Sequence, residues 1–207
     1  MIRVLIVEDQ RLMRETMENY ICRAGGYELS GSLERAGLAV SYCMANPVDL
    51  VLMDVCTGND ESGFAATAEI KAVRPDIKVV IVTSMLDFTY LDRAREVGAE
   101  GFWYKDATEA ELMSVIESVI GGETVYPDRP PKVSVGIADN YDLSEAELRV
   151  LRPLVEGDSY AEIAKRLNIS PETVKTHVSH MLQKTGFKSK TQLVAQIIKK
   201  NIIVNGY

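Results

Sequence analysis

The sequence has few cysteines and no long apolar segment. Its three cysteines are odd in number and fall in no metal-ligand spacing, which argues against a disulfide framework. No apolar run approaches the roughly 20 residues that a helix needs to cross a bilayer. The first residues also lack the apolar core and cleavage site of a signal peptide. The sequence therefore predicts a cytoplasmic protein without a membrane partner.

Charge is distributed unevenly along the chain. Residues 1–141 carry 13 Lys and Arg against 23 Asp and Glu, whereas residues 142–207 carry 10 against 7. Between Lys165 and Lys200 there are eight basic residues and a single acidic residue, Glu172. This basic stretch suggests a polyanion partner, although a solvated helix face has the same composition.

Short apolar runs alternate with amphipathic segments over the first part of the chain. The runs predict β-strands at 2–7, 27–32, 50–53, 79–83 and 101–104. The amphipathic segments predict helices at 11–23, 65–73, 90–97 and 109–120. We interpret this part as an α/β domain with a flavodoxin-like, doubly wound, five-stranded parallel sheet. Its functional site is expected at the carboxyl ends of the strands.

The periodicity stops at Gly121-Gly122, where a stretch rich in proline and polar residues begins. We therefore expect a first domain at 1–122, a linker at 123–141 and a second domain at 142–207. The second domain has no strand signal and four predicted helices, at 144–155, 160–167, 171–184 and 190–199. Two of these are short and joined by a tight turn, which predicts a small all-α domain with a helix-turn-helix.

Polar side chains with related chemistry follow the predicted strands. Glu8 and Asp9 follow the first strand, Asp54 the third, Thr83 the fourth and Lys105 the fifth. A doubly wound sheet brings strand ends together, so these side chains should share one crevice. Each residue alone is more often a turn former, a cap or a solvated group. Together they indicate a hard cation such as Mg²⁺, which usually accompanies phosphoryl chemistry.

The segments that carry these residues resemble the signature strands of response-regulator receiver domains. They are Leu5–Asp9, Val51–Asp54, Val82–Ser84 and Gly101–Asp106. The resemblance implies that Asp54 is the phosphoacceptor and that Thr83 and Lys105 sense the phosphoryl group. It further implies a switch role for Phe102, and it gives the Mg²⁺ ligands as Glu8, Asp9, Asp54 and the backbone carbonyl of Cys56.

One departure from the family lies directly after Asp54. Receivers usually have Met-Pro there, and a glycine eight residues after the phosphoacceptor. This chain has no Met-Pro between Cys56 and Gly63, and one extra residue precedes Gly63. The loop is therefore remodelled, and it is polar enough to alter metal affinity or phosphoryl lifetime.

The predicted helix at 171–184 combines an apolar face with a polar one. The apolar face comprises Val174, Val178, Met181 and Leu182, while the remaining positions are mostly small polar, amide or basic. Such a polar face suits the DNA major groove, although an ordinary bundle helix also has a wet face.

The second domain closely resembles the LuxR-type DNA-binding domain of NarL/FixJ-family response regulators. The matching segments are Ala161–Ala164, Ile169–Val178 and Lys184–Gly186. The resemblance implies that Lys175, Thr176 and Ser179 face bases and that phosphates are contacted by Thr173, His180, Lys184, Lys188 and Lys190. It also implies a dimer surface on the last helix, around Leu193, Val194 and Ile197.

These features predict a two-component response regulator rather than an enzyme. A cognate sensor histidine kinase would phosphorylate Asp54, phosphorylation would promote a homodimer, and the dimer would bind a double-stranded DNA operator with two half-sites to control transcription. Two alternatives remain. An Asp-nucleophile phosphatase is disfavoured because Cys56 takes the place of its second acid. A phosphorylation-independent DNA-binding protein, whose receiver only dimerises, is kept open by the altered loop.

Overall fold

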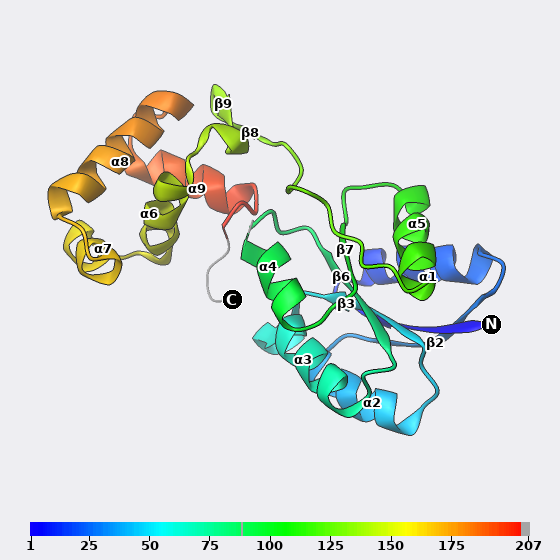
Figure 1. The fold of residues 1–207 in the computed structure, drawn as a ribbon. Helices are drawn as coiled ribbons and strands as arrows, with labels where there is room; N and C mark the ends of the chain where they lie inside the picture. The colour runs from blue at the N-terminus through cyan, green and yellow to red at the C-terminus, as the bar shows by residue number, and fades with distance from the viewer. Residues whose placement is uncertain (88, 204–207) are drawn as a thin grey trace. The chain divides into compact units, whose positions relative to one another are not determined.

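The computed structural model describes residues 1–87 and 89–203, except for the side chain of residue 60 (Figure 1). The chain divides near residue 130 into two compact units, and residues 85–87 group with the second unit. None of the helices in these ranges is long and apolar enough to cross a membrane.

The first unit is built on a five-stranded parallel sheet with the order β2-β1-β3-β6-β7. Its strands are β1 (Ile2–Val7), β2 (Tyr27–Leu33), β3 (Leu50–Asp54), β6 (Lys78–Thr83) and β7 (Gly101–Tyr104). β3 is buried along its whole length, as expected for a central parallel strand covered on both faces. The flavodoxin-like doubly wound sheet predicted from the sequence is confirmed.

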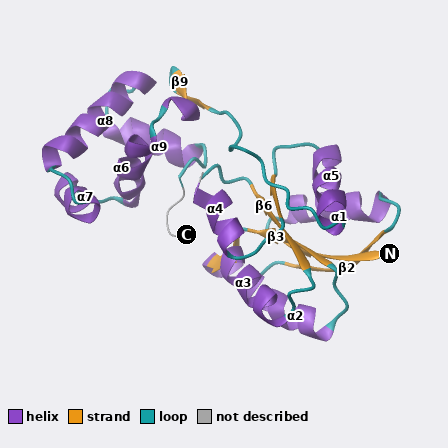
Figure 2. Ribbon diagram, viewed as in Figure 1, coloured by secondary structure: helices purple, strands orange, loops and turns teal. Residues whose placement is uncertain are grey.

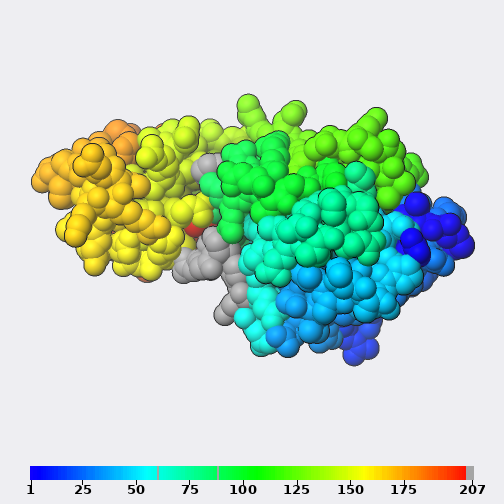
Figure 3. All heavy atoms as spheres, turned by 60° about the horizontal axis from the view of Figure 1, so that its bottom comes forward, coloured from blue at the N-terminus to red at the C-terminus, as the bar shows by residue number. Residues whose placement is uncertain are grey.

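Helices cover both faces of this sheet (Figure 2). α1 (Arg11–Arg23) and α5 (Glu109–Ile120) pack on one face through Met17, Ile21, Leu112 and Ile116. The other face carries α2 (Ala39–Ala45), α3 (Gly63–Val73) and α4 (Thr89–Glu96), whose outer surface is seen in Figure 3. The sequence pattern does not locate α2, because this helix has only seven residues and follows a short 3-10 turn, η1 (Ala36–Leu38).

The loop after Asp54 contains a small hairpin that the sequence did not predict. β4 (Cys56–Thr57) pairs antiparallel with β5 (Glu61–Ser62), and the turn η2 (Gly58–Asp60) has Asn59 in the left-handed region at φ 65°. Gly63 ends the loop, where an added Cβ would lie 1.9 Å from the Asp54 carbonyl oxygen. The close approach of the two backbones explains why glycine stands at this position.

The second unit contains four helices, α6 (Glu145–Glu156), α7 (Tyr160–Leu167), α8 (Pro171–Thr185) and α9 (Lys190–Lys199). Each begins after a serine whose side chain accepts a hydrogen bond from a backbone N–H of the first turn. Asn168 adopts a left-handed conformation between α7 and α8 and so permits the tight turn of the helix-turn-helix. The predicted all-α domain is confirmed, with residues 204–207 outside the described part of the chain.

The segment 123–141, expected as a linker, is structured at both ends. Val125 forms a parallel bridge with Gly101, and its carbonyl accepts a hydrogen bond from the N–H of Phe102. Near the other end, the hairpin β8 (Ser134–Val135) and β9 (Ala138–Asp139) places Val135 in the core of the second unit. Composition alone reveals neither the bridge to Gly101, which lies 24 residues before Val125, nor the packing of Val135 against helices that follow it in the chain.

Candidate functional site

Three carboxylates converge at the carboxyl edge of the sheet in the first unit. Glu8 and Asp9 directly follow β1, and Asp54 ends β3. These two strands are parallel neighbours, so their carboxyl ends lie at the same edge of the sheet. One oxygen from each carboxylate lies within 4.8 Å of the others. Glu8 and Asp54 are buried, whereas Asp9 is exposed. The geometry agrees with the predicted convergence of these residues and gives the oxygen ligands that a hard divalent cation prefers.

Lys105 supplies the positive charge in this cluster. Its Nζ lies 2.6 Å from Glu8 Oε2 and 2.9 Å from Asp54 Oδ2, and its side chain is 4% exposed. A buried lysine can remain charged when it contacts two carboxylates. The ammonium nevertheless balances only part of the negative charge of the three acids. The residues present therefore fit a bound cation.

The environment of Asp54 changes its protonation. Burial raises the pKa of the Asp54 carboxyl to about 7, although Lys105 opposes this rise, and Glu8 and Asp9 raise it further. Without a cation, Asp54 is therefore partly protonated near neutral pH. A cation placed among these oxygens would favour the ionised, nucleophilic form.

Thr83, Phe102 and Cys56 also lie where the sequence placed them in the fold. Thr83 is fully buried at the end of β6, and its carbonyl accepts a hydrogen bond from the N–H of Lys105 at 2.9 Å. Phe102 is 1% exposed in β7, with its ring centroid 5.0 Å from that of Tyr104. Cys56 begins β4, two residues after Asp54. Their roles in phosphoryl sensing, switching and metal binding remain predictions.

In the second unit, α8 has the two faces expected from the sequence. Val174, Val178 and Met181 are buried against the other helices. The predicted DNA contacts are all exposed; they are Thr173, Lys175, Thr176, Ser179, His180, Lys184, Lys188 and Lys190. The surface that a DNA duplex could meet is thus polar and partly basic.

Lys184 has a structural partner that the sequence did not suggest. Its Nζ lies 2.8 Å from Glu147 Oε2 and donates to the carbonyl of Asp142 at 3.0 Å. Although burial opposes ionisation of Glu147, hydrogen bonds from Lys184 and Ser144 lower its pKa. Lys184 therefore ties α8 to the start of α6. Glu147 also caps the start of α6 by accepting the N–H of Ser144, whereas its ion-pair partner lies 37 residues away.

The expectation for the dimer surface on α9 is wrong for two of its three residues. Leu193 and Ile197 are fully buried in the core of the second unit, so they cannot face a partner. The helix turns these residues inward because they share the apolar stripe that packs on the other helices. Val194 is half-buried, and Ile198 on the outer side of α9 is 44% exposed.

Two family models match the chain. A model described as the response regulator receiver domain matches residues 4–117, and a model described as bacterial regulatory proteins of the luxR family matches residues 141–197. The response regulator protein VraR of Staphylococcus epidermidis is 31% identical over 210 residues, which cover 98% of this chain and 99% of that protein. VraR of Staphylococcus aureus is 30% identical with the same coverage.

Solved structures show the same architecture. A LuxR-family two-component response regulator from Aurantimonas sp. has a TM-score of 0.58 at 27% identity and covers 61% of this chain and 89% of that one. The response regulator RcsB in a complex with DNA has a TM-score of 0.64 and covers 95% of this chain and 97% of that one, but its 18% identity shows the fold alone.

Both matching models describe regulators rather than enzymes, which agrees with the prediction that this chain is not an enzyme. The phosphatase alternative therefore gains no support. The chain belongs to the two-component response regulators that combine a receiver domain with a DNA-binding domain of the luxR family.

Proposed function

We propose that this regulator is controlled by phosphorylation of Asp54 by a sensor histidine kinase in the cytoplasm. The observation that carries the proposal is the placement of the Asp54 carboxylate, 2.9 Å from the Lys105 ammonium and beside Glu8 and Asp9. This arrangement offers a nucleophile, a cation and further oxygen ligands in one buried crevice. These are the parts that phosphoryl transfer requires, because its catalysis consists mainly of positioning and charge neutralisation.

Mg²⁺ is the cofactor that we assign to this crevice. Glu8, Asp9 and Asp54, together with the backbone carbonyl of Cys56, would hold it. When bound, it would supply positive charge that neutralises the carboxylates and the incoming phosphoryl oxygens. The three convergent carboxylates support this assignment, because the single ammonium of Lys105 balances only part of their negative charge.

The transfer itself needs only the residues of this site and the donor. An ionised Asp54 oxygen forms a bond to phosphorus while the bond from phosphorus to the donor histidine nitrogen breaks, and that nitrogen keeps the electron pair. Lys105 then pairs with a phosphoryl oxygen, and the hydroxyl of Thr83 donates to another. Movement of Thr83 would open space for Phe102 to change its rotamer, which would pass the signal to the surface of the receiver domain.

The output is binding to an operator with two half-sites by a homodimer. α8 would enter the major groove with Lys175, Thr176 and Ser179 toward the bases, while Thr173, His180, Lys188 and Lys190 contact phosphates. Lys184 would also contact a phosphate, in addition to its ion pair with Glu147. We assign the receiver to residues 1–122, the linker to 123–141 and the DNA-binding domain to 142–207.

The decisive experiment is phosphorylation of the whole chain with acetyl phosphate and Mg²⁺. Intact mass spectrometry should show one added phosphoryl group in the wild type and none in Asp54→Ala. The variant should keep the wild-type circular dichroism spectrum, because Asp54 lies in a crevice and contributes little apolar packing. Equal phosphate incorporation in the two proteins would refute Asp54 as the acceptor.

The remodelled loop after Asp54 favours a second candidate function, a DNA-binding regulator that acts without phosphorylation and whose receiver serves only for dimerisation. A wild-type protein that takes up no phosphoryl group, yet dimerises and binds operator DNA, would support this second function.

A further inference from the structure

The hairpin after Asp54 is attached to residues 34–37, which lead from the end of β2 into η1. Thr57 is 2% exposed, and its hydroxyl accepts the N–H of Ala36 at 2.8 Å. The Glu61 carboxylate accepts the N–H of Gly37 at 2.7 Å and forms an ion pair with Arg35, whose Nε lies 2.9 Å away. Residues 34–37 thus hold the loop through two backbone amides and one charged side chain.

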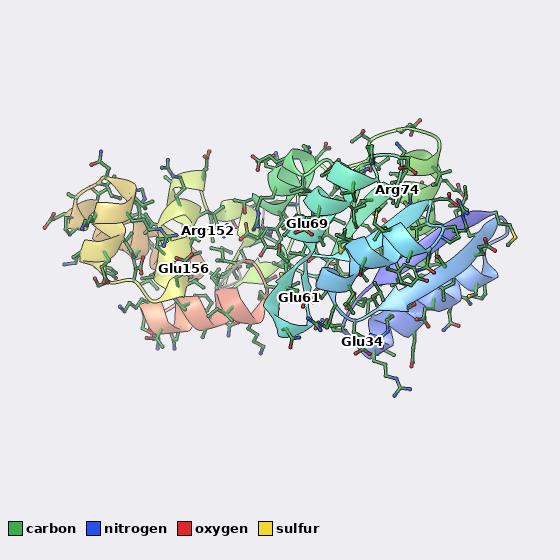
Figure 4. All side chains as sticks on the ribbon, turned by 90° about the horizontal axis from the view of Figure 1, so that it is seen from below. Glu34, Glu61, Glu69, Arg74, Arg152 and Glu156 are labelled. Carbon is green, nitrogen blue, oxygen red and sulfur yellow. The ribbon has the colours of Figure 1, made fainter. Side chains whose placement is uncertain are left out.

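The same segment also holds the loop that carries Glu8 and Asp9. Glu34 forms an ion pair with Arg14 at 2.8 Å. The Arg14 guanidinium donates to the carbonyl of Glu8 at 2.7 Å and to that of Asp9 at 3.4 Å. Glu34 and Glu61 lie on the same side of the first unit in Figure 4. Residues 34–37, which we call the strut, therefore connect the two loops that flank the acidic site.

We propose that Arg35 and Glu61 are positioning residues for the metal site. This inference rests on the proposed function. The pair fixes the inserted hairpin on the strut, and the strut fixes the loop after β1, so that the ligands from both loops keep one relative geometry. Mg²⁺ demands near-ideal octahedral geometry, and loss of the groups that orient its ligands lowers its affinity.

The ion pair between Arg35 and Glu61 affects the position of the hairpin more than the folding free energy of the chain. The side chains of Arg35 and Glu61 are 47% and 20% exposed, and ion pairs with this exposure contribute little to folding free energy. Thr57 and its hydrogen bond to Ala36 would still hold one side of the hairpin if the pair were lost. The expected consequence is a hairpin that is displaced or mobile in a protein that remains folded.

For Arg35→Met, long-range electrostatics and positioning predict opposite changes in Mg²⁺ affinity. Arg35 is a cation near an acidic site, so its charge alone should repel Mg²⁺. Arg35→Met removes the charge, and electrostatics alone would tighten Mg²⁺ binding. Positioning predicts weaker binding, because the substitution removes the ion pair and leaves the Glu61 carboxylate held on the strut only by the N–H of Gly37. The sign of the change therefore separates the two effects.

The experiment measures Mg²⁺ affinity in the full chain, by fluorescence of Trp103 and by the rise of Tm with Mg²⁺ concentration. Arg35→Met and Glu61→Ala should raise the Mg²⁺ Kd by roughly 3- to 10-fold, below the usual range for ligand-orienting partners because other hydrogen bonds remain. Glu61→Gln should have a smaller effect, since its amide oxygen still accepts a hydrogen bond. Asp76→Asn is the matched control, because it breaks an ion pair with Arg74 that does not touch the strut.

A measurement without metal checks that the pair holds the loop. Amide hydrogen exchange at Ala36 and Gly37 should be faster in Glu61→Ala than in the wild type and in Asp76→Asn. Unchanged exchange together with a lower Mg²⁺ affinity would contradict positioning, because the strut would then be intact.

The outcomes distinguish this inference from the proposed function. Wild-type or tighter Mg²⁺ binding in Arg35→Met overturns the inference alone, provided that Asp9→Asn abolishes binding. A wild-type protein that binds no Mg²⁺ overturns the metal assignment and the inference together.

Discussion

At the residue scale, Asp54, which we propose as the phosphoacceptor, lies in an environment that disfavours its ionised form. Its carboxyl has an ordinary pKa of 3.8, and burial raises this value to about 7 in the folded protein. The folded chain therefore keeps a proton that the unfolded chain has already lost at intermediate pH. This proton's contribution to the free energy of unfolding is fully present at low pH and is lost as the pH rises from about 4 to about 7.

The Asp54→Asn protein should lack this pH dependence. Without metal, its Tm should exceed that of the wild type by several degrees at pH 8 and by much less at pH 5. Thermal unfolding followed by circular dichroism measures both differences. Added Mg²⁺ should raise the wild-type Tm at pH 8, because the cation stabilises the ionised carboxylates. Parallel Tm curves for the two proteins over this pH range would show that Asp54 titrates normally.

At the element scale, the junction between the loop after β3 and α3 depends on a close backbone contact. A Cβ on Gly63 would lie 1.9 Å from the Asp54 carbonyl oxygen, whereas a Cβ on Gly58 would lie no closer than 3.6 Å to the atoms around it. The N–H of Gly63 also donates to the Val55 carbonyl at 2.8 Å. The position of the Asp54 backbone is therefore coupled to the start of α3.

Gly63→Ala should destabilise the chain by about 2 kcal/mol or more, because the backbone at Asp54 has to shift. It should also slow phosphorylation by acetyl phosphate. Gly58→Ala is the control and should change stability by less than about 1 kcal/mol. Urea unfolding gives the free energies, and intact mass against time gives the rates. A Gly63→Ala protein that behaves like Gly58→Ala would mean that the hairpin absorbs the clash.

α8 is the element on which DNA recognition depends in the proposed function. Lys175→Ala should reduce discrimination between operator and random DNA by about 1 to 3 kcal/mol, because a donor to a base edge is lost. Lys188→Ala should weaken binding to both DNAs equally and lower the salt-dependence slope by about one unit, since one phosphate contact is lost. Titrations at several salt concentrations separate the two patterns. If each substitution weakens binding to operator and random DNA by the same factor, Lys175 does not contact bases.

At the scale of the whole molecule, the proposed function requires that phosphorylation of the receiver domain change either the oligomeric state of the chain or the exposure of α8. Treatment with beryllofluoride and Mg²⁺ should shift the chain toward a dimer and tighten its binding to DNA with two half-sites about one helical turn apart. Size-exclusion chromatography with light scattering measures the mass, and the untreated protein and Asp54→Ala serve as controls. A treated protein that stays monomeric with unchanged DNA affinity would remove dimerisation as the mode of control.

The sequence by itself determined the sheet, most helices and the convergence of the acidic residues with Lys105. Apolar periodicity located β1, β3, β6 and β7 to within a residue or two, since buried parallel strands need continuous apolar runs. Strand ends then placed Glu8, Asp54 and Lys105 together, because parallel strands share one carboxyl edge. The serine caps and the proline at the first position of α8 are further signals of this local kind.

Only the tertiary structure decided the contacts between distant segments. The pairing of Glu61 with Arg35, the ion pair between Lys184 and Glu147, and the burial of Leu193 depend on which elements meet in space. A charged or apolar residue on an amphipathic helix has the same local pattern whether its neighbour is solvent, a partner chain or the core of its own domain. The two ion pairs join residues 26 and 37 positions apart, and no local periodicity encodes such contacts.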